Sequence, residues 1–140
     1  MTRLIGIVIS SSAAIFLSSQ FYSFVLLHSD VYIMHGVWAD NVILKPGEQI
    51  VLNYDFTRKR LCKTDLIRAV WGETDNKNYF RITAAGGASP PGRMNPPVKV
   101  PVDLPDLPVG CYKFYTFTLA ECSEGRHDFM DPPVRFCVSP

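Results

Sequence analysis

Residues that could bind a metal ion are concentrated near the end of the chain, in AECSEGRHDFMDPPVRFC at positions 120 to 137. Cysteine, histidine and aspartate are common ligands of zinc and other transition metals. His127, Asp128 and Asp131, however, share one short segment, and no fourth ligand follows at the spacing of a zinc or calcium motif. The pattern therefore favours a solvated loop closed by disulfides, with no metal and no cofactor.

Groups able to catalyse a reaction are scarce. No Gly-x-Ser-x-Gly nucleophile elbow occurs in the sequence. The paired acids Asp103 and Asp106 flank prolines in an expected surface turn, where Asp106 is better suited to shaping the turn than to general acid–base chemistry. We therefore expect a protein that is not an enzyme and has no catalytic residues.

The segment TRKRLCK, residues 57 to 63, concentrates positive charge. In an up-and-down sandwich, this loop lies at the same end as the Pro- and Gly-rich loop AGGASPPGRMNPP and the loop from Cys122 to Pro132. That end is either a solvated rim or a surface that binds an acidic partner, anionic lipid headgroups or an envelope polymer. The candidate binding residues are Arg58, Lys59, Arg60, Lys63, Arg93 and Arg126.

Residues 4 to 27, LIGIVISSSAAIFLSSQFYSFVLL, carry no charge. As a helix rising about 1.5 Å per residue, this stretch is roughly 36 Å long and crosses a bilayer with some tilt. Arg3 precedes it, whereas Asp30 and Asp40 are the first charges after it, which predicts a cytoplasmic N-terminus and an exported C-terminal part. A cleaved signal peptide is the alternative, although the apolar stretch exceeds the usual roughly 7 to 15 residues.

Small residues recur every four positions within this stretch, at Gly6, Ser10, Ala14 and Ser18. On a helix they share one face, and small side chains let the backbones of two membrane helices approach closely. We expect this face to pack against another transmembrane helix. The alternative is that serine is simply tolerated in the span.

After a predicted stalk at 28–41, the hydrophobic period changes to two. Apolar and polar residues alternate in QIVLNYDF and in PVKVPVDLP, as in half-buried strands. Five further short runs, separated by turn signals, fit the same scheme, at 41–44, 66–72, 78–84, 111–119 and 134–138. We expect an anchor at 1–27, the stalk at 28–41 and, at 42–140, an all-β antiparallel sandwich of about seven strands.

At DLPVGCY the chain resembles the immunoglobulin-like superfold, in which an Asp, a Gly and a Tyr precede or open the penultimate strand. The resemblance spans about residues 42 to 138. It implies that Tyr112 is a tyrosine-corner residue, whose hydroxyl hydrogen-bonds the backbone near the preceding turn. The family's cysteine two residues after this tyrosine is Phe114 here, so the disulfide pairing of antibody domains cannot be transferred.

The chain contains four cysteines, an even number that suits a disulfide framework in an exported domain. Side chains alternate between the two faces of a strand. If the aromatic residues of the penultimate strand point inward, Cys111 and Cys137 both lie on the outer face of the last two strands. Cys62 and Cys122 share the inward parity, which favours a bridge between the sheets. Among the three possible connectivities, parity thus favours Cys62–Cys122 with Cys111–Cys137.

These features predict a single-pass envelope protein that presents a small Ig-like β-sandwich in the periplasm or outside the cell and acts by binding or scaffolding. In size and format it resembles small accessory membrane proteins of bacteria or phages. Two alternatives stay open: a subunit or assembly factor of a membrane complex that docks through its transmembrane helix, and a secreted effector or inhibitor if the N-terminus is cleaved.

The expected partners are the membrane and another membrane or envelope protein, including a second copy of the chain through the transmembrane helix. With 14 basic and 13 acidic residues the formal net charge is +1. No overall field therefore selects for nucleic acid, and any charge-based recognition must come from local clusters.

Overall fold

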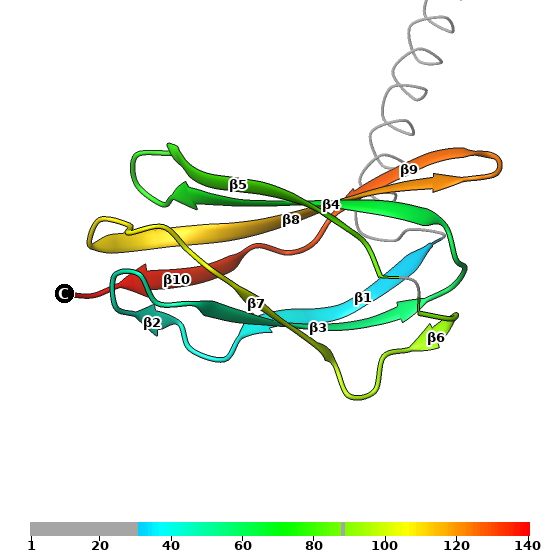
Figure 1. Ribbon diagram of the computed structural model, residues 1–140, viewed down its shortest axis with the longest axis horizontal. Helices are drawn as coiled ribbons and strands as arrows, with labels where there is room; N and C mark the ends of the chain where they lie inside the picture. The colour runs from blue at the N-terminus through cyan, green and yellow to red at the C-terminus, as the bar shows by residue number, and fades with distance from the viewer. Residues whose placement is uncertain (1–30, 88) are drawn as a thin grey trace, which may run out of the picture.

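The computed structural model describes residues 31–87 and 89–140, which form an all-β fold of two packed sheets (Figure 1). The four-stranded sheet, called sheet A, contains β1 (Tyr32–Ala39), β3 (Ile50–Arg58), β6 (Gly92–Arg93) and β7 (Val98–Val102). The six-stranded sheet, called sheet B, contains β2 (Ile43–Leu44), β4 (Lys63–Gly72), β5 (Asn78–Ala85), β8 (Gly110–Cys122), β9 (Gly125–Met130) and β10 (Val134–Val138).

The predicted anchor at 1–27 lies outside the described residues, and so does its small-residue face of Gly6, Ser10, Ala14 and Ser18. Within the described ranges, no helix is long and apolar enough to cross a membrane. The anchor therefore stays a prediction.

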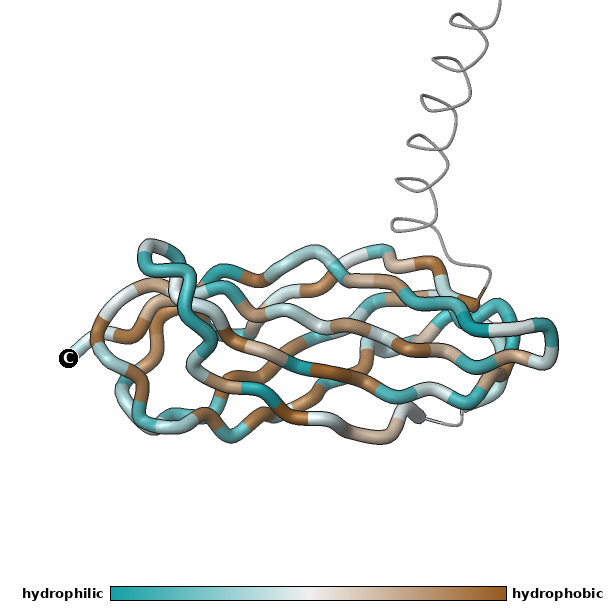
Figure 2. Tube along the Cα trace, turned by 90° about the horizontal axis from the view of Figure 1, so that it is seen from above, coloured by the Kyte–Doolittle hydropathy of each residue, from teal (hydrophilic) through white to brown (hydrophobic). Residues whose placement is uncertain are grey.

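Sheet B is organised around β8, a strand of 13 residues. Its first half pairs with β10 and its second half with β9, while β4 pairs along its other edge. Every second residue of β8 is buried from Tyr112 to Ala120, because these side chains face sheet A. Figure 2 shows the same alternation of hydrophobic and hydrophilic residues along the strands.

Sheet A is organised around β3. β1 pairs with one edge of β3, and the other edge pairs with β7 over Ile50–Tyr54 and with β6 at Thr57 and Arg58. Buried side chains of the two sheets meet in a main core that includes Phe114, Phe136 and Leu52. Fully burying side chains of this size stabilises a fold by roughly 1.5 to 3 kcal/mol each.

A second, smaller core lies at the other end of the sandwich. It contains Val31, Tyr32, Ala120 and Phe129. The two cores are separate clusters, and the residues between them are considered with the functional site below.

All seven predicted strands are present, and the described part of the chain contains three more: β1, β6 and β9. Residues 32–39, expected to belong to a stalk, instead form β1. A β-bulge between Met34 and Gly36 interrupts the alternation of this strand, which hid it in the sequence. The expected antiparallel order also has one exception, because β2 pairs with β10 in parallel.

The loop expected at the end of the chain is a β-hairpin. β8 and β9 pair from Phe117–Met130 to Cys122–Gly125, and Gly125 takes a φ of 144°, which a residue with a Cβ rarely adopts. β9 has the sequence GRHDFM, in which Phe129 is the one buried residue, so no alternation marked it as a strand.

Both disulfides join the predicted partners, Cys62 to Cys122 and Cys111 to Cys137. The expected bridge between sheets is wrong, however. Cys62 immediately precedes β4 and lies opposite Cys122 of β8, with a Cα–Cα distance of 4.9 Å, so this bond stays within sheet B. The inward parity was correct, because the pair packs against the smaller core. Cys111 and Cys137 are direct partners in the β8–β10 ladder.

Tyr112 is buried and donates its hydroxyl hydrogen bond to the carbonyl of Pro108. This is the backbone contact that the immunoglobulin resemblance implied for a tyrosine corner. Its ring stacks on Phe136 at a centroid distance of 5.6 Å and meets Tyr79 edge-on at 5.3 Å. The residue thus ties the turn before β8 to the main core.

Candidate functional site

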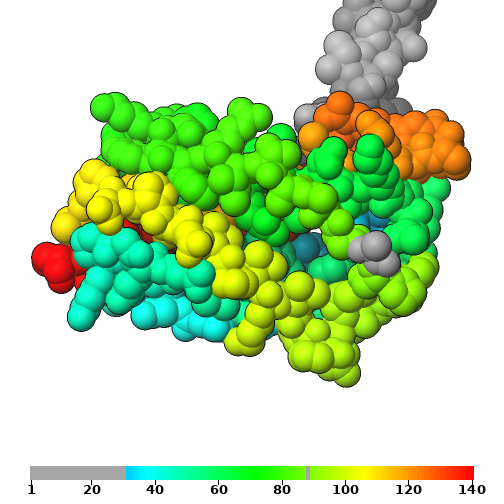
Figure 3. All heavy atoms as spheres, in the orientation of Figure 1, coloured from blue at the N-terminus to red at the C-terminus, as the bar shows by residue number. Residues whose placement is uncertain are grey.

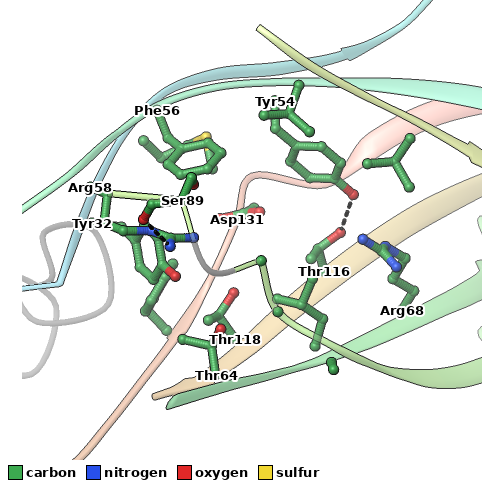
Figure 4. Close-up of a pocket in the computed structure, with 18 residues that line it drawn as sticks. Tyr32, Tyr54, Phe56, Arg58, Thr64, Arg68, Ser89, Thr116, Thr118 and Asp131 are labelled. Carbon is green, nitrogen blue, oxygen red and sulfur yellow. Dashed lines mark hydrogen bonds between the residues drawn. The ribbon is translucent and has the colours of Figure 1, made fainter. Parts of the chain in front are cut away.

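A cavity of about 300 Å³ lies between the two sheets. It separates the main core from the smaller core, because Tyr54 of the first and Tyr32 and Phe129 of the second belong to its lining. Figure 3 shows a hollow in this region of the surface, with blue atoms of the N-terminal strand inside it. Figure 4 shows the side chains that line the cavity.

The sheet B wall is polar because the inward positions of two strands change character along their length. On β8 the inward residues Tyr112 and Phe114 fill the main core, but the next two are Thr116 and Thr118. These smaller side chains fill less of the space between the sheets than aromatic rings would. On β4 the inward Arg68 lines the same space.

The sheet A wall is mainly apolar. β1 and β3 contribute Tyr32, Met34, Tyr54 and Phe56, and β7 contributes Val98 and Val100. The hydroxyl groups of Tyr54 and Thr116 are 2.9 Å apart and form a hydrogen bond between the sheets. Burial raises the pKa of Tyr54, so this hydroxyl remains protonated at neutral pH. The cavity therefore has one apolar wall and one polar wall.

Gly86, Gly87 and Ser89, which lie between β5 and β6, line one side of the cavity. Gly86 donates its N–H to the carbonyl of Thr64 at 2.8 Å, and a Cβ on Gly86 would lie 1.7 Å from Thr64 Oγ1. Only glycine permits this close approach. Three residues later, the carbonyl of Ser89 accepts a hydrogen bond of 2.6 Å from Arg58 Nη1.

Arg58 belongs to the basic segment that was expected at the surface, yet its side chain lies inside the fold. Its guanidinium lies over the ring of Tyr32, 5.3 Å from the centroid, in a cation–π contact. Arg58, Arg68 and Asp131 have only 3%, 7% and 4% of their surface exposed. Three buried charged side chains therefore line the cavity.

Asp131 follows β9 directly, and its N–H donates to the carbonyl of Thr116 at 3.0 Å. Burial raises the pKa of the Asp131 carboxyl to about 7, although the positive charge of Arg68 acts in the opposite direction. Within the described residues, Asp131 Oδ1, Arg58 Nε and Arg68 Nε are buried without a hydrogen-bond partner. Unpaired buried polar atoms are rare in folded proteins and are a feature of functional sites.

The other predicted binding residues lie at the end of the sandwich where β3 connects to β4, and three of them form ion pairs with carboxylates. Arg60 forms an ion pair with Glu124, Arg93 with Asp55 at 3.0 Å, and Arg126 with Asp128 at 2.7 Å. Lys59 and Lys63 are exposed. The structure therefore presents a surface of mixed charge at this end, and binding of an acidic partner there stays a prediction.

The three candidate metal ligands do not come together. Asp128 pairs with Arg126 at the surface, His127 lies 3.0 Å from Glu124, and Asp131 is buried in the cavity. Cys122, Glu124 and His127 do form a compact group, but Cys122 is in a disulfide and offers no thiolate. The guanidinium of Arg60 also contacts both Glu124 and His127.

The sequence interpretation missed Arg68, Asp131 and the two threonines. Arg68 was part of an expected strand, and Asp131 was considered only as a metal ligand on a solvated loop. The available signal was parity, since Thr116 and Thr118 share the inward parity of Tyr112 and Phe114. A polar residue at an inward position, next to aromatic residues, indicates an interior that is not purely a core.

No family model matches the chain, and no curated protein matches it. Among solved structures, it is similar to Spo0M, a sporulation control protein from Bacillus subtilis, with 17% sequence identity and a TM-score of 0.40. The similarity covers 79% of this chain and 50% of Spo0M, so the chain spans about half the length of that protein. The two are distant structural neighbours with β-rich folds.

Proposed function

We propose that this protein is a binding module of the cell envelope, held by an N-terminal transmembrane helix and exposing an immunoglobulin-like sandwich outside the cytoplasm. Its binding site is the cavity between the sheets. Two disulfides favour an oxidising compartment, and the tyrosine corner at Tyr112 supports the immunoglobulin-like assignment.

One observation carries the proposal: the interior between the two cores is hollow, and three buried charged side chains face an apolar wall across it. Protein interiors are normally close-packed, and buried charges without partners are costly. A pocket with an apolar wall and a few convergent polar groups is the usual form of a small-molecule site. Its volume of about 300 Å³ suits a small ligand.

Filling the cavity tests the proposal. In the full chain, Thr118→Phe places a ring at the buried wall, whereas Thr83→Phe places one at an exposed position of β5. We expect fragments that bind the wild-type chain, as detected by ligand-observed NMR, to lose binding in Thr118→Phe and to keep it in Thr83→Phe.

Thr118→Val serves as a second control, because it removes the hydroxyl but leaves the space, and it should keep binding of apolar fragments. Fragments that bind all the variants equally would place the binding site elsewhere and would contradict the proposal.

A further inference from the structure

The charges of the side chains that line the cavity do not sum to zero. Among its described lining residues the charged ones are Arg58, Arg68 and Asp131, and each is more than nine-tenths buried. Two positive charges and one negative charge leave a net charge of +1. If Asp131 is protonated, the net charge is +2.

Among the described residues that line the cavity, Arg58 is the one whose charge is left uncompensated. Arg68 has Asp131 nearby, since the two interact electrostatically. Arg58 instead donates to the neutral carbonyl of Ser89 and stacks over Tyr32. Among residues 31–87 and 89–140, no carboxylate forms an ion pair with Arg58, although Arg60, Arg93, Arg126 and Arg135 each have one.

A guanidinium that is buried without a counter-charge is unfavourable, because burial removes its hydration. For Arg58, one carbonyl and one ring face replace only part of that hydration. Arg60, Arg93 and Arg126 instead keep 38%, 61% and 57% of their side chains exposed, so water still solvates their charges. Arg58 therefore gains the most from pairing with an anion. Its planar guanidinium can donate two parallel hydrogen bonds, which suits a carboxylate or a phosphate ester.

We propose that the cavity binds a small organic monoanion, whose acid group pairs with Arg58 and whose apolar body lies against Tyr32, Phe56 and Phe129. This inference rests on the proposed function and specifies the ligand class. An organic acid fits better than an inorganic ion because the wall around Arg58 is aromatic. The polar wall, with Thr116, Thr118 and Asp131, then accommodates any further polar group on the ligand.

The test compares an acid with its neutral analogue. Benzoate and benzamide have nearly the same size and shape, and so do hexanoate and hexanamide, so each pair isolates the charge. Binding of these four probes, and of inorganic phosphate, is measured by equilibrium dialysis with the full chain in uncharged detergent micelles. Protein-free micelles correct for partitioning of the probes.

We expect the wild-type chain to bind at least one acid at least about tenfold tighter than its amide, as for a charge-assisted pair in a dry site. Arg58→Gln should reduce this acid-to-amide ratio to about one, while Arg58→Lys should keep part of it. Arg81→Gln, which removes an exposed arginine from β5, should leave the ratio unchanged. Amide binding that is retained in Arg58→Gln shows that the variant is folded, because an unfolded chain would bind neither the acid nor the amide.

Four results would overturn the inference: equal binding of acid and amide by the wild-type chain, a ratio unaffected by Arg58→Gln, phosphate bound as tightly as the organic acids, or no binding of any probe. The proposed function fails separately. If acid and amide bind equally and Thr118→Phe abolishes both, the cavity is a binding site for neutral molecules. If Thr118→Phe abolishes neither, the cavity is not the site.

Discussion

Asp131 makes the stability of the domain depend on pH in an unusual direction. Its pKa is raised from 3.8 to about 7 by burial, so between these values the folded chain holds a proton that the unfolded chain has released. The free energy of unfolding therefore contains a contribution that is fully present below about pH 4 and is lost as the pH rises towards 7. The other ionisable groups lining the cavity are Arg58, Arg68, Tyr54 and Tyr32.

We expect Asp131→Asn, which keeps the shape and removes the charge, to be more stable than the wild type at pH 8 by a few kcal/mol, about 4 at most. Between pH 5 and pH 8 its urea midpoint should change less than that of the wild type. Asp128→Asn, at an exposed acid of the same segment, is the control. Parallel pH profiles for the wild type and Asp131→Asn would contradict the burial argument.

Tyr112→Phe removes one hydroxyl and retains the ring packing against Phe136 and Tyr79. Because the carbonyl of Pro108 loses its donor, we expect a loss of about 1 kcal/mol in the free energy of unfolding. Tyr115→Phe is the matched control, since the ring of Tyr115 stacks on Phe117 on the outer face of the same strand. Equal destabilisation by the two substitutions would show that the corner hydrogen bond contributes nothing of its own.

At the scale of the elements, the two disulfides differ in where they lie. Cys62–Cys122 closes 60 residues and packs against the smaller core, whereas Cys111–Cys137 closes 26 and staples two strands that already pair. Loop length alone accounts for less than about 1 kcal/mol of difference in the chain-entropy relation. The inner position of Cys62–Cys122 adds the loss of buried contacts when it is removed.

Replacing Cys62 and Cys122 together by Ala should therefore lower the melting temperature of the full chain more than replacing Cys111 and Cys137. Differential scanning calorimetry measures this, and non-reducing peptide mapping confirms which bond remains in each variant. An equal or reversed order would mean that the outer bond, at the β8–β10 ladder, carries more of the stability than its position indicates.

Alternation and turn signals together located seven strands. Alternation failed at β1, where a bulge breaks the period, and at β6 and β9, in which Phe129 is the one buried residue. Alternation also gave the cysteine pairing, because the face of a strand that a side chain occupies depends only on its position along that strand. Whether a bond runs within a sheet or between sheets depends on strand order, and alternation contains no information on order.

The cavity illustrates the same limit. Parity could have placed Thr116 and Thr118 inward beside the aromatic residues of β8. It could not bring Arg58 of β3 and Asp131 to the same space, because that requires the packing of sheet A on sheet B. Basic composition had marked Arg58 as a surface residue, and tertiary packing overrode that expectation.

At the scale of the whole molecule, the proposed topology makes a direct prediction. With an uncleaved span at residues 4–27, an epitope tag after Pro140 should be accessible to antibody in intact cells, or in spheroplasts for a periplasmic domain. A tag before Met1 should become accessible only after the membrane is permeabilised. A C-terminal tag that is protected in intact spheroplasts would contradict export of the domain.

Few residues separate β1 of the folded domain from the proposed anchor. Val31 is completely buried, and the uncharged stretch ends at Leu27, so residues 28–30 alone separate them. Three residues reach at most roughly 11 Å. With the proposed anchor in the bilayer, such a short connection would hold the end of the sandwich at which β1 begins close to the lipid headgroups. For the ligand class proposed here, this position would expose the cavity to amphiphilic molecules concentrated at the membrane surface, and a raised effective concentration would increase occupancy at a given affinity.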